Sequence, residues 1–430
     1  MIELIINKLR NKKILILGFG REGQSSLKFL LGHFPQAEIG IADQQPIDPA
    51  FIRLSHNQRV NIHTGVDYLS SLTDYDLVLK SPGISLKTAV TGETIISSQT
   101  DLFLEAFSHQ VIGVTGTKGK STTASLIHHL LTASGEHSIL TGNIGIPCFD
   151  IMQLIEDATW VVFELSANQL ENIRHSPHIA VLLNIYEEHL DHFGTFEAYS
   201  HAKYNIMRFC RQGDVVVSHT DFYKSGNSCQ AKVSLFSGSG MDHLSALSPL
   251  KGKHNLLNIK AALLAVTNAG VPESEALRHL PSFSGLPHRL EYIGCVEGVH
   301  YYNDSIATIP EATIAAIEAI GKVSFLLLGG FDRGISYQSL VDYLTEHQVP
   351  DILLTGKAGQ RISELLDKVE LKSRRHWFNN LTQAIETVRE IAKPGDICLL
   401  SPAAASYDQY KNFEQRGELF REIVLSKKSV

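Results

Sequence analysis

The segment with the clearest chemistry is a glycine-rich run, GTKGKST, which follows an apolar stretch and precedes a stretch typical of a helix. Gly116 and Gly119 permit backbone conformations closed to other residues, so consecutive N–H groups can surround phosphate oxygens at the start of a helix. Lys120 supplies a positive charge for the β- and γ-phosphates, and Ser121 is placed to ligate Mg²⁺. We therefore predict a nucleoside triphosphate site, formed by Gly116, Thr117, Lys118, Gly119, Lys120, Ser121 and Thr122.

This run departs from the strict GxxxxGK[ST] pattern, because Val114 stands where the first glycine is expected. A glycine-rich turn without a ligand is the alternative interpretation. The strand expected over residues 110–114, together with the helix expected after the loop, favours the nucleotide site.

A second glycine motif, GxGxxG, follows the first expected strand at Gly18, Gly20 and Gly23, and Asp43 ends the next expected strand. This pattern is typical of dinucleotide sites, with the carboxylate on a ribose. The chain has a separate triphosphate loop and no marked hydride-transfer partner, so we favour the diphosphate of a UDP-sugar at this helix N-terminus. An NAD-dependent oxidoreductase and a purely structural turn are the alternatives.

The elements that must position these motifs are short apolar strands alternating with helices along all 430 residues. Such alternation predicts parallel sheets with crossover helices, and the length suits three domains. We expect an α/β protein with a Rossmann-like UDP-binding domain, a central P-loop ATPase-type domain with a parallel sheet, and a C-terminal Rossmann-like domain. The expected boundaries are 1–108, 109–285 and 286–430.

Composition narrows the functional classes. A net charge of -7 argues against a general nucleic-acid binder, which needs clustered Lys and Arg. No apolar run approaches the length of about 20 residues that a membrane span requires, and no signal peptide is evident, so we expect a cytoplasmic protein. The scattered cysteines are expected to be reduced and mostly buried: Cys148, Cys210, Cys229, Cys295 and Cys398.

A series of blocks follows along the chain: VIGVTGTKGKSTT, LTGNIGIP, FELSANQLE, LNIYEEHLDHFGTFEAYSHAK, KGKHNLLNIKAALLA, GLPHRLE, YYNDSIATIP, LLLGG and LLSPAAASYDQYKNFEQRG. In this order they resemble the Mur ligase family, and the last block is most similar to its glutamate-adding members. The resemblance runs from Gly18 to Arg416. It implies an ATP-dependent amide ligase of peptidoglycan precursor synthesis that works through an acyl phosphate. It also implies UDP-N-acetylmuramoyl-L-alanine and glutamate, most readily D-glutamate, as substrates, two Mg²⁺ ions and a monomeric enzyme.

The resemblance assigns the catalytic and metal-binding groups. Lys120 would neutralise the charge of the phosphates, and Glu164, at a strand end, would hold Mg²⁺ with Ser121. His189 is similar to a second metal ligand or substrate contact. Lys203 resembles the lysine that the family carbamylates, which would turn a cation into a metal-binding carboxylate and requires burial near the metals.

Other contacts are carried over in the same way. The resemblance places further ATP contacts at Asn255, Asn258, Arg289 and Asp304. It places contacts with the UDP-linked substrate at Gly18, Gly20, Gly23, Asp43, Ser81, Gly83, Asn143, Ser166 and His189.

For the incoming amino acid the resemblance points to Thr308, Ser406 and Phe413, with Arg333 in place of a lysine of the family. Ile306 also replaces an expected lysine. Because these departures lie in the expected amino-acid pocket, a ligase for L-glutamate or another amino acid is an alternative. Two further alternatives are a folylpolyglutamate synthase-like ligase and, in a different functional class, a P-loop ATPase that acts as a switch.

Overall fold

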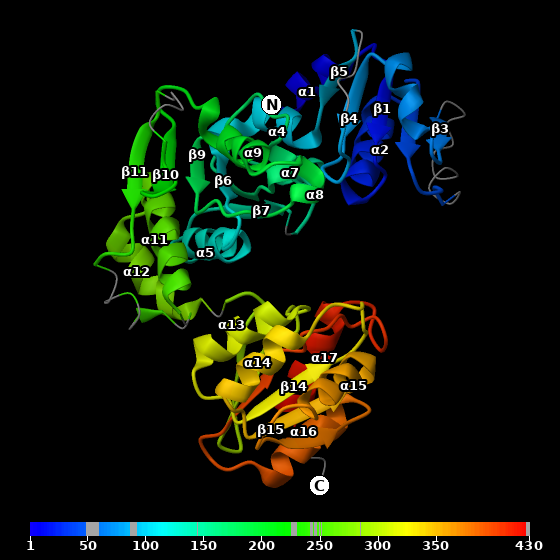
Figure 1. Ribbon diagram of the computed structural model, residues 1–430. Coiled ribbons are helices and arrows are strands. Elements are labelled where there is room, and N and C mark those ends of the chain that lie inside the picture. The colour runs from blue at the N-terminus through cyan, green and yellow to red at the C-terminus, as the bar shows by residue number, and fades with distance from the viewer. Residues whose placement is uncertain are drawn as a thin grey trace. The chain divides into compact units, whose positions relative to one another are not determined.

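The computed structural model describes residues 1–426 apart from 49–59, 87–92, 144, 225–229, 241–243, 245–246, 249, 251 and 284. Within the described residues the chain forms three sheets (Figure 1). It divides into two compact units, of which the first comprises 1–248 with 253–283 and the second 249–252 with 284–430. Two sheets lie in the first unit and the third sheet lies in the second.

The first sheet is parallel, in the order β3-β2-β1-β4-β5. Its strands are β1 (Ile14–Leu17), β2 (Ile39–Asp43), β3 (Val60–Thr64), β4 (Leu77–Lys80) and β5 (Ile95–Ser97). Helices α1 (Ile2–Leu9), α2 (Arg21–His33) and α4 (Gln99–Phe107) accompany it. The strand order reverses between β1 and β4, and open α/β sheets bind ligands in the crevice at such a point.

The second sheet is also parallel, in the order β11-β10-β9-β6-β8-β7. Its strands are β6 (Val111–Thr115), β7 (Ser138–Gly142), β8 (Trp160–Glu164), β9 (Ile179–Leu182), β10 (Val215–His219) and β11 (Lys232–Phe236). Its helices are α5 (Lys120–Ala133), α6 (Cys148–Ile151), α7 (Ala167–Leu170), α8 (Leu190–Phe193), α9 (Phe196–Arg208), α11 (Lys253–Asn268) and α12 (Glu273–His279). Because β6 lies between β8 and β9, the loops that follow these three strands share one edge of the sheet.

The third sheet has the order β12-β13-β17-β14-β15-β16, in which only the β12–β13 pair is antiparallel. Its strands are β12 (Glu291–Val296), β13 (Val299–Asn303), β14 (Phe325–Gly329), β15 (Asp351–Thr355), β16 (Arg374–Trp377) and β17 (Ile397–Leu400). Its helices are α13 (Pro310–Ile320), α14 (Gln338–Glu346), α15 (Gly356–Leu366), α16 (Leu381–Ile391) and α17 (Phe413–Leu425). The predicted α/β class with three mainly parallel sheets is confirmed.

The inner strands β1, β9 and β14 are fully buried and consist almost entirely of apolar residues, as expected where helices cover a parallel sheet. The edge strands β3 and β16 are more polar and more exposed. In the first unit one hydrophobic core joins both sheets. Phe103 of α4 meets Phe163 of β8 edge to face there, with ring centroids 5.6 Å apart. The second unit has its own cores.

Two further expectations concern the chain as a whole. In the described part of the chain no helix combines the length and the apolar character needed to cross a membrane. Cys148, Cys210 and Cys398 are buried thiols, whereas Cys295 is exposed, and Cys229 lies outside the described residues.

Candidate functional site

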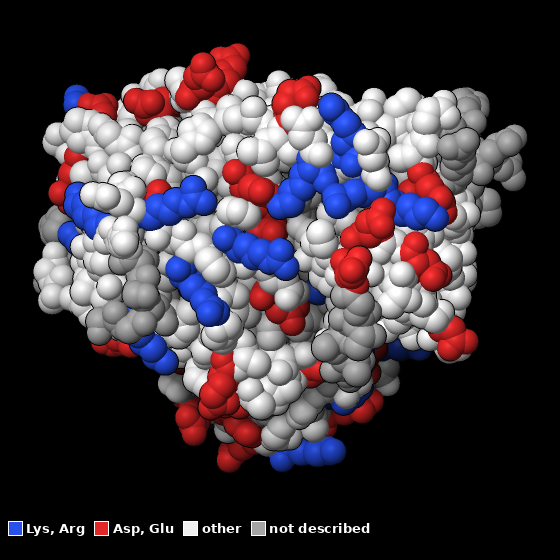
Figure 2. All heavy atoms as spheres, turned by 90° about the horizontal axis from the view of Figure 1, so that it is seen from above, with Lys and Arg blue, Asp and Glu red and all other residues white. Residues whose placement is uncertain are grey.

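The exposed charges give little guidance to the site, because acidic and basic side chains are mixed on the face seen in Figure 2. Solvent weakens interactions among such charges. Buried charged groups are more informative, since burial is costly unless the group is paired or has a function. Buried charged residues in the first unit include Lys80, Glu164 and Lys203, and those in the second unit include Asp304 and Arg416.

The phosphate loop joins β6 to α5. Gly119 caps the helix with a φ of 87°, a left-handed conformation that favours glycine. A Cβ atom at this position would stand 2.3 Å from Oδ1 of Asn258 in α11. Asn258 in turn donates to Oδ1 of Asn255 over 3.1 Å. The structure thus brings two residues predicted to contact ATP to the predicted phosphate loop.

We expect Gly119→Ala to raise the KM for ATP by about tenfold or more, because a displacement near 1 Å in a binding loop costs that much or more. Gly135→Ala is the matched control, since Gly135 has a φ of 90° but open space around its missing Cβ. Both variants bear a similar backbone strain of about 1–2 kcal/mol. Phosphate-release kinetics at varied ATP would contradict the expectation if both variants gave the same KM.

Asn184 is a residue of this loop that sequence reasoning missed. It follows β9, and its side chain binds the backbone of Lys118 in both directions, accepting from N–H over 2.9 Å and donating to the carbonyl over 3.0 Å. This two-way contact fixes the middle of the phosphate loop against the neighbouring strand. The asparagine of the LNIYEEH block was the available signal.

Two lysines converge on one backbone oxygen of the loop. Lys120 Nζ donates to the carbonyls of Gly116 and Thr117 over 3.0 Å each. Lys203 Nζ, from α9, donates to the same Gly116 carbonyl over 2.8 Å. Lys203 is only 1% exposed, and its amine lies 4.9 Å from the centre of the Tyr199 ring. The burial expected for this lysine is therefore observed.

The environment of Lys203 favours the neutral amine. Burial is the main cause that brings the pKa of Lys203 well below its usual value, and repulsion from Lys120 lowers it further. The carboxylates of Glu188 and Glu164 act in the opposite direction. A neutral amine has a free electron pair, which is the form that can add to CO₂.

Glu164 ends β8 and is fully buried. Its Oε1 accepts from Nδ2 of Asn143 over 2.9 Å, and its backbone carbonyl accepts from the Asn143 N–H over 3.0 Å. Its Oε2 has no hydrogen-bond partner among the described residues. A buried carboxylate oxygen without a donor suits a cation, so Glu164 fits the predicted Mg²⁺ ligand.

The protein residues alone do not complete a metal cage. In the described part of the chain, no cluster of three or more His, Cys, Asp or Glu side chains is arranged to hold an ion. Mg²⁺ usually binds to one or two carboxylates together with phosphates and water. Glu164 therefore fits a Mg²⁺ ion that is also bound by the phosphates of a nucleotide.

His189 precedes α8 in a left-handed conformation with a φ of 58°. Its side chain is 54% exposed, and its ring lies 6.0 Å from that of Tyr199. Tyr199 therefore contacts both Lys203 and His189. Beside them Glu188 pairs with Lys118 of the phosphate loop over 2.7 Å, and this contact contributes to lowering the pKa of Glu188.

The first glycine motif lies at the point where the order of the first sheet reverses. Gly18 has a φ of 88°, and its carbonyl accepts from Ser81 Oγ over 2.8 Å. A Cβ at Gly23 would stand 2.2 Å from the same carbonyl, so this close approach requires glycine. Gly20 caps α2, and the space beside Gly83 is open. The loops after β1 and β4, which carry these predicted UDP-binding residues, are thus in direct contact.

Two residues predicted to contact the UDP-linked substrate have backbone partners in the structure. Asp43 accepts from the N–H of Phe19 over 2.7 Å and from that of Gln45 over 2.8 Å, so both carboxylate oxygens hold the turn. Ser166 forms a capping box with Gln169 at the start of α7. Their local structural roles are therefore evident, and their substrate contacts stay predictions.

In the second unit, Asp304 follows β13 and is 6% exposed. Its carboxylate accepts from Ser401 Oγ over 2.8 Å and from the Leu290 N–H over 3.0 Å. Burial raises the pKa of Asp304 to about 6, although the charge of Arg289 opposes this rise. The two predicted ATP contacts of this unit are therefore electrostatically linked.

This raised pKa predicts a pH dependence of stability. The folded state binds the Asp304 proton more tightly than the unfolded state, so the stabilisation is complete below about pH 4 and is lost as the pH rises through about 6. Between about pH 5 and 7.5 we expect wild type to lose on the order of 1 kcal/mol relative to Asp304→Asn. Denaturant unfolding of both proteins at each pH tests this, and parallel profiles would contradict it.

The predicted amino-acid residues lie on loops of the third sheet. Arg333 Nη2 donates to the Thr308 carbonyl over 2.8 Å, which brings these two together. Ser406 is buried, and Phe413 begins α17, with its carbonyl accepting from Ser305 Oγ over 2.9 Å.

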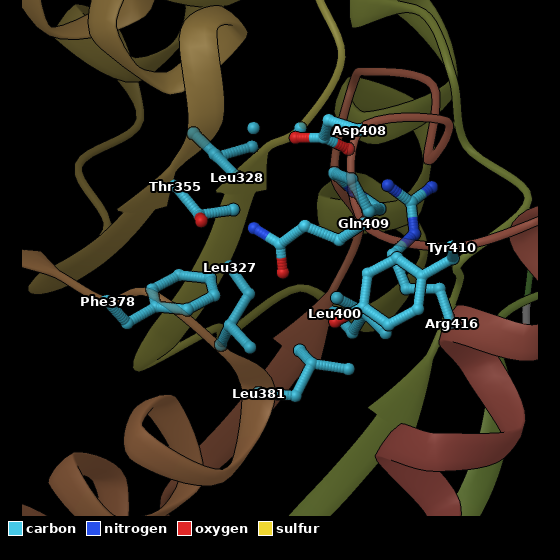
Figure 3. A pocket seen from close by; sticks show the side chains of 13 residues that line it. Leu327, Leu328, Thr355, Phe378, Leu381, Leu400, Asp408, Gln409, Tyr410 and Arg416 are labelled. Carbon is cyan, nitrogen blue, oxygen red and sulfur yellow. The ribbon is translucent and has the colours of Figure 1, made fainter.

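Arg416 is a second residue without a predicted role. It is 4% exposed, and its guanidinium donates to the Ser305 hydroxyl and to the carbonyls of Ser305, Ala404 and Ala405. Burial lowers its pKa to about 10, so it stays charged. It ties the SPAAAS loop to the loop after β13, and its place in FEQRG was the only signal. Figure 3 shows it beside Asp408, Gln409 and Tyr410 at a small cavity.

Comparison with known proteins identifies the family. Family models match as the "Mur ligase MurD-like, N-terminal domain" over residues 12–98, the "Mur ligase middle domain" over 114–233 and the "Mur ligase, glutamate ligase domain" over 288–404. The UDP-N-acetylmuramoylalanine–D-glutamate ligase of Geobacillus kaustophilus is 34% identical, covering 96% of this chain and 98% of the relative. The ligase of the same name from Koribacter versatilis is 32% identical, covering 97% and 98%.

Solved structures show the same fold. The MurF ligase of Thermotoga maritima, in complex with ADP, has a TM-score of 0.54 at 18% identity, covering 98% of this chain and 97% of that one. A UDP-N-acetylmuramoylalanyl-D-glutamyl-2,6-diaminopimelate–D-alanyl-D-alanyl ligase from Acinetobacter baumannii has a TM-score of 0.57 at 15% identity, covering 91% and 90%. The chain belongs to the Mur ligase family. Enzymes of this family are ATP-dependent ligases, which confirms the predicted enzyme class and the use of ATP.

Proposed function

We propose that this chain joins D-glutamate to the alanyl carboxylate of UDP-N-acetylmuramoyl-L-alanine, with ATP converted to ADP and phosphate. The observation that carries the proposal is the 34% identity with the Geobacillus D-glutamate ligase over 96% of this chain. In this assignment residues 1–108 bind the UDP-linked substrate, 109–285 bind ATP and 286–430 bind the amino acid. We further propose a monomeric, cytoplasmic enzyme that acts in peptidoglycan precursor synthesis.

The chemistry requires activation of a carboxylate, which is a poor electrophile. The alanyl carboxylate attacks the γ-phosphorus of ATP to give an acyl phosphate and ADP. The amino group of glutamate then attacks the acyl carbon, and phosphate leaves as the amide forms. Two unit anions at about 4 Å repel by roughly 4 kcal/mol at an effective dielectric of 20, so cationic groups must gather there. Lys120, at the phosphate loop, is suited to this role.

Mg²⁺ is the second source of positive charge, and it would neutralise the phosphate oxygens when bound. Glu164, with its unpartnered Oε2, and Ser121 would hold a first ion. Lys203, once carbamylated, and His189 would hold a second. Before modification, the Lys203 amine donates to the Gly116 carbonyl.

For amino-acid recognition we propose Arg333 as the group that binds a glutamate carboxylate, since its guanidinium can pair with it through two parallel hydrogen bonds. The Thr308 carbonyl orients this guanidinium. Ser406 and Phe413 would complete the pocket. The second candidate function, ligation of L-glutamate or another amino acid, is favoured by Ile306 and Arg333, each of which replaces a lysine that the family resemblance leads us to expect.

Phosphate release from purified protein with ATP, Mg²⁺ and UDP-N-acetylmuramoyl-L-alanine tests the proposal. We expect D-glutamate to give the highest rate, and omission of either the acceptor or the amino acid to abolish release. A higher rate with L-glutamate or another amino acid would support the second candidate. ATP hydrolysis without acceptor would instead indicate a P-loop ATPase switch.

A further inference from the structure

A line of three charged or titratable side chains, with Lys80 buried and Glu171 partly exposed, runs from the first sheet to the second. Lys80, the last residue of β4, is 5% exposed, and its Nζ lies 3.2 Å from Oε2 of Glu171. Glu171 follows α7, and the same oxygen lies 3.6 Å from Nε2 of His192 in α8. None of the three has a role in the chemistry described above.

At one end of this line, Lys80 holds the turn of residues 81–84, where we expect the UDP-linked substrate to bind. Lys80 Nζ also donates to the carbonyl of Ile84 over 2.7 Å, and the Ile84 N–H donates to the carbonyl of Ser81 over 3.2 Å. These bonds close the turn of residues 81–84, which contains the predicted UDP-binding residues Ser81 and Gly83. Ser81 in turn binds the glycine loop of β1.

The other end holds the short helix that begins after His189. His192 donates its backbone N–H to the His189 carbonyl over 3.1 Å, and its side chain is only 10% exposed. Glu171 therefore lies between a loop of the first sheet and a helix of the second. Its charge is matched by Lys80, whose pKa burial lowers and Glu171 raises.

A cavity of about 530 Å³ lies beside this line. It is lined by Ser85 and Leu86, which continue the turn of residues 81–84, by Glu171, and by His192 and Phe193 of α8. Ser85 Oγ also donates to the His192 carbonyl over 3.5 Å, so the chain after the turn touches α8 directly. This volume lies within the range of about 300–1,000 Å³ that is typical of small-molecule binding pockets. Glu171, which lines this cavity, is linked through Lys80 to the 81–84 turn.

We infer that Lys80 and Glu171 are positioning residues for the UDP-linked substrate: their ion pair fixes the 81–84 turn against the central domain. This inference rests on the proposed function, because the turn matters only if the UDP-linked substrate binds there. Neither residue touches the reacting atoms in this assignment. Loss of either should therefore weaken binding of this substrate while the ATP site, on the loop between β6 and α5, is unaffected.

The test compares Lys80→Met and Glu171→Gln with wild type in phosphate-release kinetics. We expect each to raise the KM for UDP-N-acetylmuramoyl-L-alanine by about 10- to 100-fold, the effect of a small displacement of a binding loop. The KM for ATP should change less than about twofold, because the lost ion pair supports binding of the UDP-linked substrate and not binding of ATP. In the double variant the two effects should fall well short of additive, because both variants remove one interaction.

His175→Gln is the matched control. His175 Nδ1 lies 3.1 Å from Oδ1 of Asp101, so this pair also joins α4 to the central domain, but it does not contact the 81–84 turn. We expect this variant to keep both KM values. Melting temperatures of all variants separate a general loss of stability from the selective change in KM.

Three results would overturn the inference. Unchanged KM for the UDP-linked substrate in an active Lys80→Met enzyme refutes it and leaves the proposed function intact. If Lys80→Met or Glu171→Gln changes the KM for ATP as much as the KM for the UDP-linked substrate, the effect is a general one of the domain boundary. The same holds if His175→Gln raises the KM for the UDP-linked substrate as much as these variants do. Failure of wild type both to bind UDP-N-acetylmuramoyl-L-alanine by calorimetry and to release phosphate with it refutes the inference together with the proposed function.

Discussion

Replacement of Lys203 by alanine is expected to reduce the ligation rate by on the order of a thousandfold, since a metal contributes several kcal/mol and each 1.4 kcal/mol is a factor of ten. The physical reason is the proposed conversion of this buried amine to a carboxylate that binds a cation. Its burial lowers its pKa and so increases the share of neutral amine that this conversion needs, and its contact with the Gly116 carbonyl places the amine at the phosphate loop. Phosphate release at saturating substrates measures the effect.

Two additional measurements show whether a carboxylate is required at this position. Acetate added to Lys203→Ala should restore part of the rate, because a small carboxylate can occupy the space of the missing side chain. Lys203→Arg should stay inactive with or without acetate, since it keeps a cation and fills that space. A fully active Lys203→Arg enzyme would refute the carbamate proposal.

Glu164→Gln is expected to lower the rate by about 10²- to 10³-fold and to raise the Mg²⁺ concentration needed for half-maximal rate. The substitution keeps the size of the side chain and an oxygen that can accept from Asn143. It removes the charge of the oxygen that has no partner among the described residues. Rates measured over a Mg²⁺ titration at fixed ATP test this expectation.

Asn143→Ala separates the charge of Glu164 from its orientation. This variant breaks the hydrogen bond between Asn143 and Glu164, which Glu164→Gln keeps, but it leaves the carboxylate in place. We therefore expect its Mg²⁺ dependence to stay close to that of wild type. If Asn143→Ala shifts the Mg²⁺ dependence as much as Glu164→Gln does, orientation rather than charge explains the effect. An unchanged Mg²⁺ dependence in Glu164→Gln would argue against metal binding by this residue.

Local patterns in the sequence were enough to predict the apolar inner strands and the glycine turns, but not polar edge strands such as β3 and β16. The phosphate loop and the Gly18 turn are encoded by neighbouring residues, and the left-handed conformations at Gly18 and Gly119 agree with that interpretation. The capping box of Ser166 and Gln169 also has a local signature, a serine followed three residues later by glutamine. Attention to this signature would have suggested a structural role for Ser166 beside the substrate role taken from the resemblance.

Contacts between distant parts of the chain could not be predicted in this way. Lys203 lies 87 residues from Gly116, and only the family resemblance distinguished it from an ordinary surface lysine. Asn184 and Arg416 act through backbone carbonyls and N–H groups, which carry no residue-specific signal. The exposed Cys295, on β12, differs from the expectation of mostly buried cysteines because β12 lies at the edge of its sheet.

The hydrogen bonds of Asp43 have a consequence for inhibitor design. Many dinucleotide enzymes bind a ribose diol through a free carboxylate at this position. Here each oxygen of Asp43 already accepts from one backbone N–H, which fixes the orientation of the carboxylate and leaves a further acceptor position on each oxygen. A hydroxyl of any ligand, natural or designed, should therefore reach Asp43 only from the directions that these two N–H groups leave open, so the turn restricts the poses that an inhibitor of this site can adopt.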